Sequence, residues 1–253
     1  MVNMPAAFAW VWPRCIAHRG AGSFAPENTL AAMRLAYASG YRAVEFDVML
    51  TADAVPVLMH DTELGRTVAG RGAVAELTWS QLRERDAGAW FGEAYRGETV
   101  PSYVDVLRYC TTHGIWMNVE IKPAPGVERQ TGEIVARLTQ EQCGQMGLRA
   151  PLFSSFSPIA LDAARVVAPS IARGLLVATP PENWREQLEA LQCVALHCNH
   201  TRLSAAYCGE VKRAGYGLLA YTVNTVERAQ QLAQWGVDAF CSDRPDLLAP
   251  LIA

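Results

Sequence analysis

Two apolar segments of this 253-residue chain carry charged residues two positions apart. Glu45 and Asp47 lie in AVEFDVML (43–50), and Glu120 and Lys122 lie in IWMNVEIK (115–122). Residues two apart share one face of a β-strand, so each pair points to one side while apolar residues fill the other. Converging carboxylates repel one another unless a cation lies between them, and Mg2+ and Ca2+ prefer such hard oxygen ligands. The pattern predicts that Glu45, Asp47 and Glu120 bind a divalent cation, Mg2+ or Ca2+.

Two histidines stand at the ends of apolar runs of the same kind. His18 lies near the end of RCIAHRG (14–20), and His60 lies near the end of VPVLMHD (55–61). An imidazole has an unperturbed pKa of about 6.5, so it can give or take a proton near neutral pH. Acid–base catalysis of a displacement needs one group that takes a proton from the nucleophile and one that gives a proton to the leaving group. We therefore predict that His18 and His60 form an acid–base pair.

Arg19 and Lys122 place two cations beside the same residues. Together with three carboxylates and one divalent cation, they leave a single positive charge, which a monoanionic phosphodiester would neutralise. Arginine offers a planar fork of N–H donors that matches phosphate oxygens, and lysine offers a point charge. We predict that Arg19 and Lys122 bind the phosphate of the substrate.

Composition excludes several classes of protein. The net charge is -3 and the chain has no Lys/Arg block, so we expect neither a nucleic-acid partner nor a polybasic membrane patch. No apolar run approaches the roughly 20 residues that span a bilayer. The apolar start of the chain lacks a basic leader and is interrupted by Pro13, so we expect no signal peptide. Seven irregularly spaced cysteines are typical of free thiols in a reducing compartment, so we expect a cytoplasmic protein.

Strand-like runs alternate with helix-like segments along the whole chain, which is the pattern of a parallel sheet built from βα units. The expected strands are 14–20, 43–50, 55–61, 115–122, 151–156, 171–178, 194–199, 217–224 and 237–243. The expected helices are 28–39, 102–113, 131–143, 157–168, 182–192, 203–214 and 225–235. The strand ends gather the charged residues described above, as the C-terminal ends of strands do in barrel enzymes.

The second and third strands must form a hairpin, because residues 51–54 are too few for a parallel crossover. The remaining eight strands predict an α/β fold, a (β/α)8 TIM barrel, in one domain (1–253). Residues 62–100 form an inserted segment after the hairpin, with one short helix near Ser80–Arg85. If the turn centres on Ala52 and Asp53, Glu45 lies opposite His60, and the two side chains share a face.

The motifs AHRG…PENT, EFDV, HD, VEIKP and YTVN resemble those of the glycerophosphodiester phosphodiesterases, in order and over about residues 14–248. Within that family the chain is most similar to the bacterial cytoplasmic enzyme of glycerol-3-phosphate uptake. The resemblance implies a metal-dependent barrel enzyme that cleaves glycerophosphodiesters to sn-glycerol 3-phosphate and an alcohol. It implies the same roles for the residues already named: an acid–base pair, three metal ligands and two phosphate ligands.

The resemblance also implies roles for the first loop and the pocket wall. Glu27 and Asn28 of PENT would organise the first loop, and Asn28 would also cap the following helix. The inserted segment would cover the glycerol side of the site. We further expect His197, Tyr221 and Asn224 in the substrate pocket; many members of the family have Trp where this chain has Tyr221. CVALHCNH is not expected to bind zinc, because His197 and Cys198 alternate faces on a strand.

Other assignments stay open at the level of sequence. A phospholipase D-like enzyme acting on lysophospholipid or sphingolipid head groups would share the histidines and carboxylates. A non-catalytic barrel that binds a phosphorylated ligand is an alternative from a different class. The residues decide neither the alcohol, nor which histidine is the acid, nor whether water or the glycerol 2-hydroxyl attacks first. A homo-oligomer is also compatible with the chain.

Overall fold

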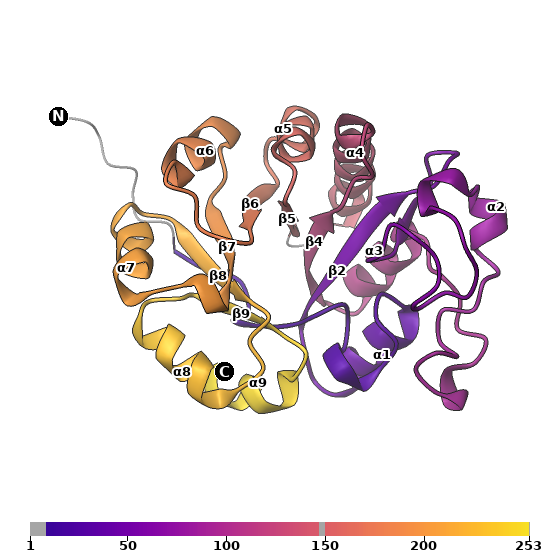
Figure 1. The fold of residues 1–253 in the computed structure, drawn as a ribbon, viewed down its shortest axis with the longest axis horizontal. Helices are drawn as coiled ribbons and strands as arrows, with labels where there is room; N and C mark the ends of the chain where they lie inside the picture. The colour runs from indigo at the N-terminus through magenta and orange to yellow at the C-terminus, as the bar shows by residue number, and fades with distance from the viewer. Residues whose placement is uncertain (1–8, 147–149, 253) are drawn as a thin grey trace.

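The computed structural model describes residues 9–146 and 150–252 as eight parallel strands closed into a barrel and surrounded by helices (Figure 1). The chain order alternates strand and helix almost throughout, and the barrel closes because β1 pairs with both β2 and β9. The parallel strands are β1 (Cys15–Ala17), β2 (Ala43–Leu50), β4 (Trp116–Ile121), β5 (Leu152–Ser155), β6 (Ala172–Val177), β7 (Ala195–Asn199), β8 (Gly217–Tyr221) and β9 (Ala239–Ser242). The expected (β/α)8 barrel is confirmed.

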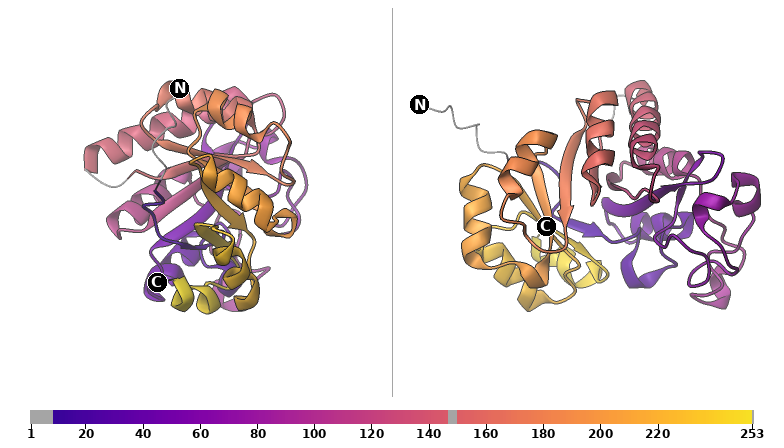
Figure 2. Two further views of the ribbon diagram at one scale, coloured as in Figure 1. Left: turned by 90° about the vertical axis from the view of Figure 1, so that its left-hand side faces the viewer. Right: turned by 45° about the horizontal axis from the view of Figure 1, so that its top comes forward.

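The helices form the outer layer, as both views of Figure 2 show. They are α1 (Leu30–Ala38), α2 (Trp79–Leu82), α3 (Tyr103–Thr112), α4 (Glu128–Met146), α5 (Pro158–Val167), α6 (Trp184–Leu191), α7 (Ala205–Arg213), α8 (Val226–Gln234) and α9 (Pro245–Ile252). The sequence pattern did not predict α9. Most expected helices are present with ends shifted by one to a few residues, while α4 starts earlier and runs longer than expected.

The core has two parts, because barrel strands are buried on both faces. Between strands and helices lie two large apolar clusters, whose members include Phe46, Tyr103, Leu107, Val119 and Phe153 in one and Leu188, Leu196, Val211, Leu218 and Phe240 in the other. Inside the barrel a smaller cluster contains Ile16, Trp116, Leu152 and Leu219. Each fully buried Leu or Phe contributes roughly 1.5–3 kcal/mol of transfer free energy, so both layers hold the strand ends in place.

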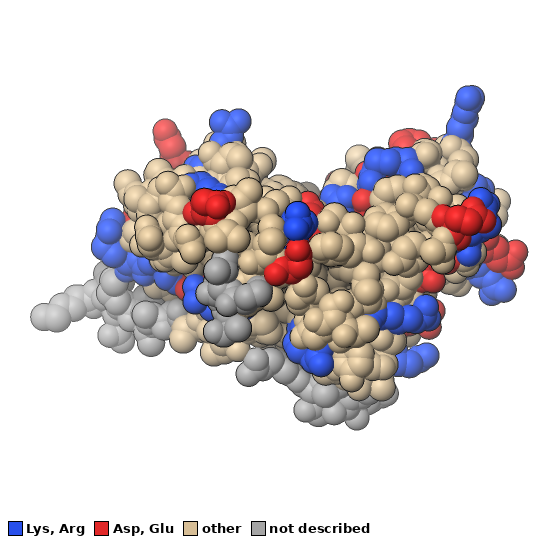
Figure 3. Space-filling model, turned by 90° about the horizontal axis from the view of Figure 1, so that it is seen from below, with Lys and Arg blue, Asp and Glu red and all other residues tan. Residues whose placement is uncertain are grey.

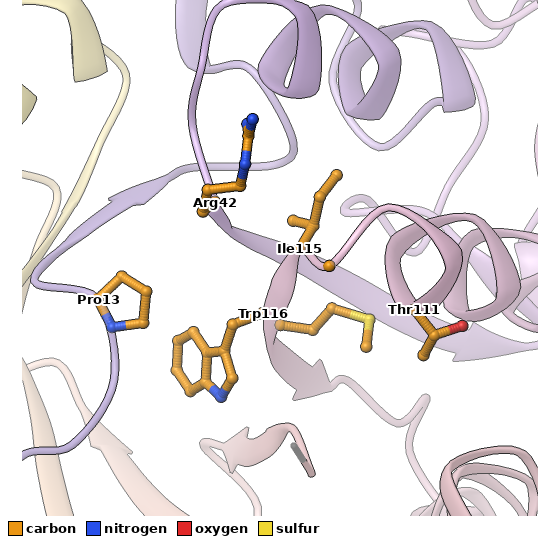
Figure 4. Close-up of a pocket in the computed structure, with 7 residues that line it drawn as sticks. Pro13, Arg42, Thr111, Ile115 and Trp116 are labelled. Carbon is orange, nitrogen blue, oxygen red and sulfur yellow. The ribbon is translucent and has the colours of Figure 1, made fainter. Parts of the chain in front are cut away.

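Aromatic residues close the N-terminal end of the barrel. Trp12 stacks on Trp116 with ring centroids 5.4 Å apart, and Trp10 meets Trp12 edge-on at 5.1 Å. Beside them lies a cavity of about 290 Å³ with Pro13, Arg42 and Trp116 in its wall (Figure 4). These residues precede or begin their strands, so this cavity lies at the opposite end of the barrel from the charged strand ends.

The register expected for the hairpin is wrong by one residue. β2 pairs antiparallel with β3 (Pro56–Leu58) through Val48 and Leu58, so the ladder, if extended, places His60 opposite Phe46 and not opposite Glu45. β3 ends at Leu58, so His60 reaches the site from the segment that follows the strand.

The turn explains the shift, because its loop has three residues instead of two. The Thr51 amide donates to the Val55 carbonyl (3.0 Å), and Ala54 takes the left-handed conformation at φ 60°. The Thr51 hydroxyl donates to the Asp53 carboxylate (2.6 Å) and accepts from the Val55 amide (3.0 Å). A three-residue hairpin loop commonly ends with such a left-handed residue. These side-chain bonds stabilise the longer loop even without a glycine at position 54.

Residues 62–100 lie beside the hairpin, at the edge of the molecule that carries α2 (Figure 1). They form turns, α2 and the short 3-10 helices Val74–Glu76 and Glu93–Tyr95. Their apolar side chains pack with the hairpin in a separate cluster that includes Met49, Val57, Leu64, Leu82 and Val100. The segment is thus held by its own small core, and it leads from His60 to α3.

The face shown in Figure 3 carries Lys and Arg side chains interspersed with Asp and Glu. Among the residues that the structure describes, no continuous basic field covers that face. Within the described residues, no helix is both long enough and apolar enough to cross a membrane.

Candidate active site

Three carboxylates converge at the carboxyl ends of β2 and β4. Glu45 pairs in register with Asn118 and Asp47 with Glu120, so alternation along both strands turns all three side chains into the barrel mouth. Glu45 is 4% exposed and Asp47 is 1% exposed. One oxygen from each of Glu45, Asp47 and Glu120 lies within 4.8 Å of the other two, so the set could hold a metal ion. The structure brings together the three acidic residues that the spacing singled out.

Cations and an amide surround Asp47. Lys122 Nζ lies 3.2 Å from Asp47 Oδ1, and Arg19 Nε lies 3.6 Å from Asp47 Oδ2. The Asn28 amide donates to Asp47 Oδ2 at 2.8 Å and accepts from the Asp47 backbone N–H at 3.1 Å. Burial alone would raise the pKa of Asp47, but Lys122 and Arg19 outweigh it and hold the pKa below its usual range. Asp47 is therefore ionised at neutral pH.

Glu45 and Glu120 have the opposite electrostatics. Burial, followed by the charge of Asp47, raises the pKa of Glu45 to about 7. The same two causes raise the pKa of Glu120 well above its usual range. Lys122 and Arg19 outweigh burial at Asp47, but no cations do so at Glu45 and Glu120 among the described residues. The cluster is therefore short of positive charge. A divalent cation between the oxygens would supply that charge.

The sequence suggested that Asn28 caps α1, but the structure shows that it does not. Thr29 is the N-cap, and its side chain accepts from the Ala32 amide. Asn28 instead takes the left-handed conformation at φ 58°, which turns its side chain inward to Asp47. Asparagine tolerates this conformation better than most residues, and the buried amide is satisfied on both sides by Asp47.

Arg19 and Glu27 connect the first loop to the site. Arg19 takes φ 52°, and its backbone N–H donates to Glu45 Oε2 at 3.0 Å. Its guanidinium donates to Glu27 Oε1 at 2.8 Å, and Arg66 of segment 62–100 donates to both oxygens of Glu27 at 2.7 Å. Glu27 therefore joins the first loop to segment 62–100 and holds Arg19 beside Asp47.

His18 lies between two carboxylates. Its Nδ1 is 2.6 Å from Asp243 Oδ1, beyond the end of β9, and its Nε2 is 3.9 Å from Glu45 Oε2. Burial would lower the pKa of His18, but the Asp243 hydrogen bond and the Glu45 charge outweigh it and raise the pKa above 6.5. Asn224 in turn holds Asp243 through its amide groups, at 3.1 Å and 2.9 Å. Asn224 therefore acts on the site through Asp243.

His60 is half-buried on the other side of the carboxylates. Its Nδ1 is 2.8 Å from Asp61 Oδ1, and Arg66 Nε donates to Asp61 Oδ2 at 2.6 Å. Burial is the largest influence on the pKa of His60, and the cations Lys122 and Arg19 add to it. Asp47 and Asp61 oppose them without prevailing, so the pKa of His60 falls below 6.5.

A small cavity of about 40 Å³ extends from the carboxylates into the barrel. Tyr221 and the exposed Phe156 form an edge-to-face pair in its wall, and the Tyr221 hydroxyl donates to the Val177 carbonyl at 2.9 Å. His197 also lines the cavity, where Gly174 leaves room for the ring: a Cβ there would lie 2.4 Å from His197 Nε2. Tyr221 and His197 therefore both line this cavity.

Several polar atoms in this interior have no hydrogen-bond partner among the described residues. They are Asn118 Oδ1, Ser154 Oγ and both ring nitrogens of His197. Burial lowers the pKa of His197 to about 3, so the ring is neutral at pH 7. Cys198, the next residue, lies in the cluster between strands and helices, so His197 and Cys198 lie on opposite faces of β7.

Sequence reasoning did not assign roles to Asp61, Arg66 and Asp243, which the structure brings to the site. Asp61 had a usable signal, since it follows His60 directly. Asp243 also stands at a strand end, but only the closure of β9 on β1 shows that it pairs with His18. Nothing in the sequence near Arg66 indicates its bonds to Glu27.

Comparison with known proteins gives a family match over most of the chain. Residues 18–247 match the glycerophosphoryl diester phosphodiesterase family. A glycerophosphodiester phosphodiesterase of Caldanaerobacter subterraneus subsp. tengcongensis is 30% identical over 242 residues, which cover 94% of this chain and 96% of that protein.

Solved structures give the same result. A phosphodiesterase of Oleispira antarctica, in complex with the product sn-glycerol-3-phosphate, is 38% identical with a TM-score of 0.88, over 95% of this chain and 97% of that one. A glycerophosphodiester phosphodiesterase of Agrobacterium tumefaciens is 28% identical with a TM-score of 0.76, over 94% of this chain and 100% of that one.

The barrel and its cluster of acidic, basic and imidazole groups define a hydrolase of phosphodiesters. The chain belongs to the glycerophosphoryl diester phosphodiesterase family. The expectations for fold, family and enzyme class are confirmed.

Proposed function

We propose that this enzyme hydrolyses glycerophosphodiesters to sn-glycerol 3-phosphate and an alcohol, with His18 and His60 as its acid–base pair and a divalent cation at Glu45, Asp47 and Glu120. The observation that carries the proposal is the placement of three carboxylates, of which Glu45 and Asp47 are buried, between two histidines and two cations at one end of the barrel. The sn-glycerol-3-phosphate bound to the Oleispira antarctica phosphodiesterase supports the choice of product.

The three carboxylates fit a hard divalent cation such as Mg2+ or Ca2+. They offer only oxygen donors within 4.8 Å of one another, and burial and the charge of Asp47 raise the pKa values of Glu45 and Glu120. When bound, the cation would supply positive charge to the phosphoryl oxygens. Such binding would also restore Glu45 and Glu120 to their ionised forms at neutral pH, since a nearby positive charge favours the carboxylate.

Arg19 and Lys122 would hold the phosphate in the remaining positive region. Within the described part of the chain, Lys122 Nζ has one close carboxylate partner, Asp47 at 3.2 Å, so it can turn donors towards the substrate. The Arg19 side chain is fixed by Glu27 through its Nη1, which leaves other N–H donors of the fork for phosphate oxygens. Both charges would stabilise the negative charge that grows on the equatorial oxygens during displacement.

The two histidines would move the protons of the reaction. One takes the proton of the attacking hydroxyl as the new P–O bond forms, and the other gives a proton to the leaving alkoxide as the old P–O bond breaks. His18 keeps its proton to a higher pH than His60, because two carboxylates face it. We therefore assign the acid to His18 and the base to His60.

The entire chain, 1–253, would form one such domain, with segment 62–100 as its insertion on the glycerol side. Arg66 connects this segment to the site, because its guanidinium donates hydrogen bonds to Asp61 and Glu27. The Trp90–Phe91–Tyr95 ring series, in which successive rings meet edge-on, stiffens the same segment. A glycerol group bound near His60 would thus meet a wall that is fixed before substrate arrives.

The test is release of sn-glycerol 3-phosphate from glycerophosphoethanolamine, followed by a coupled assay. Activity should disappear with EDTA and return with Mg2+ or Ca2+. A parallel reaction with micellar lysophosphatidylcholine separates the phospholipase D-like alternative, which predicts faster turnover of the lipid than of the water-soluble diester. Folded protein that releases no product with any divalent cation would contradict the proposal and favour a binding role.

A further inference from the structure

Cys241 is a thiol inside the barrel mouth to which the proposed reaction gives no role. It lies on β9, in register with Ile16 of β1, and it is 2% exposed. Its Sγ, a nitrogen of His18 and an oxygen of Glu45 all lie within 4.8 Å of one another. The chain therefore holds two candidate ligand sets that share Glu45: one of oxygens only, and one of nitrogen, oxygen and sulfur.

His18 is oriented as a metal-binding imidazole would be. Its Nδ1 is engaged by Asp243 at 2.6 Å, so in the neutral ring Nδ1 carries the hydrogen and the lone pair lies on Nε2. That Nε2 faces Glu45 Oε2 at 3.9 Å. A carboxylate that fixes the tautomer from behind is the common outer partner of a zinc-bound histidine.

The space next to these atoms suits one ion. Zinc bonds of about 2.0–2.3 Å to nitrogen, oxygen and sulfur can be made with small shifts from a separation of 3.9 Å. The three residues line the cavity of about 40 Å³, more than the roughly 10–15 Å³ that a single water needs. His197 lines the same cavity, fully buried and with both nitrogens unpartnered among the described residues.

The donor types select the ion. Mg2+ and Ca2+ take oxygen ligands and do not favour thiolates, whereas Zn2+ is commonly held by Cys, His and carboxylate together. We propose that Zn2+ binds at His18, Glu45 and Cys241 and inhibits the enzyme. Binding releases the thiol proton to solvent as the Zn–S bond forms. The ion would then be bound by the His18 lone pair and by Glu45. Glu45 would no longer be available to the oxygen-only set.

This inference rests on the proposed function, because inhibition requires that His18 and Glu45 work in the reaction. Its first test is a zinc titration of the Mg2+- or Ca2+-activated enzyme. Cys241→Val should keep basal activity and need roughly 10- to 100-fold more zinc for half-inhibition, since even lost outer partners cost that much affinity. Cys198→Val is the matched control: its thiol is also buried on a strand but faces the helices, so it should keep the zinc sensitivity of the natural chain.

The second test reads the site without turnover. Co2+ added to metal-free protein should give a thiolate-to-cobalt absorption band in the near ultraviolet that Cys198→Val keeps and Cys241→Val lacks. If Cys241→Val fails to fold, as judged by circular dichroism, Cys241→Ser replaces it. Equal zinc sensitivity and equal cobalt spectra in the natural chain and the Cys241 variant would overturn the zinc site. An inactive enzyme with the cobalt band would overturn the proposed function and leave the site standing.

Discussion

The two histidines of the site are held in contrasting ways. His18 is paired with Asp243, a residue 225 positions away that arrives with the last strand, and Glu45 faces its other nitrogen. His60 is paired with its chain neighbour Asp61, which also bonds Arg66, and the cations Lys122 and Arg19 act on it. The first ring is fixed by the closed barrel, and the second by a local turn. The difference shows how one site can raise the pKa of one imidazole and lower that of the other.

Removal of either ring should have the largest effect. His18→Ala and His60→Ala should each lower kcat/KM by roughly 10²- to 10⁴-fold, the usual contribution of a general acid or base. A nitrophenyl diester, whose leaving group needs no proton, should restore much of the activity of His18→Ala and little of that of His60→Ala. Steady-state kinetics on both substrates checks this. The reverse pattern of rescue would exchange the two roles.

Removal of Asp243, the distant partner of His18, should have the second largest effect on activity. Asp243→Asn keeps the shape of the side chain but removes its charge, so we expect a loss of kcat of roughly 10- to 100-fold, as for other outer partners that orient a ring. Asp243 raises the pKa of His18, so its loss lowers that pKa. Since the acid must be protonated, the alkaline limb of the kcat–pH profile should move to lower pH. An unchanged limb would show that Asp243 only shapes the loop.

Removal of Asp61, the partner next to His60 in the chain, should lower activity less. Asp61 is partly exposed and shared with Arg66, and pairs of this kind contribute about 0.2–1 kcal/mol, so Asp61→Asn should lower kcat at neutral pH by no more than roughly fivefold. The Asp61 hydrogen bond raises the pKa of His60, so its loss lowers that pKa further. Because the base must be neutral, the acid limb of the profile should move to lower pH. A loss of kcat as large as that of Asp243→Asn would contradict the proposed difference between the two histidines.

The smallest expected effect is the difference between the pKa values of His18 and His60. In metal-free protein, NMR titration of the imidazole rings should place the pKa of His18 above 6.5 and that of His60 below it. His197 should show no titration between pH 5 and 8, because burial lowers its pKa to about 3. Coinciding curves for His18 and His60 would mean that the metal, and not the protein, sets their difference.

Much of the barrel could be predicted from sequence because both of its signals are local. Strand-length apolar runs alternate with helical segments, and short links such as residues 51–54 exclude a parallel crossover. The gathering of Glu45, Asp47 and Glu120 followed from two rules: residues two apart share a face, and parallel strands end at one rim.

The errors arose where side chains override local propensity. The hairpin register depended on Thr51, whose hydroxyl bonds Asp53 and Val55 and so lengthens the loop by one residue. The cap of α1 depended on Asp47, which draws Asn28 inward and leaves the cap to Thr29. The roles of Asp243 and Arg66 depended on contacts between segments far apart in the chain, which no local pattern records.

The seam between β1 and β9 sets the order in which a newly made chain gains its activity. The His18 amide donates to the Ser242 carbonyl at 2.9 Å, and its ring meets Asp243. A chain that has left the ribosome only as far as β8 carries both histidines and all three carboxylates, yet it lacks a neighbour for one edge of β1 and the carboxylate that steadies His18. If His18 acts as proposed, we expect activity only after the last strand docks and the barrel is complete.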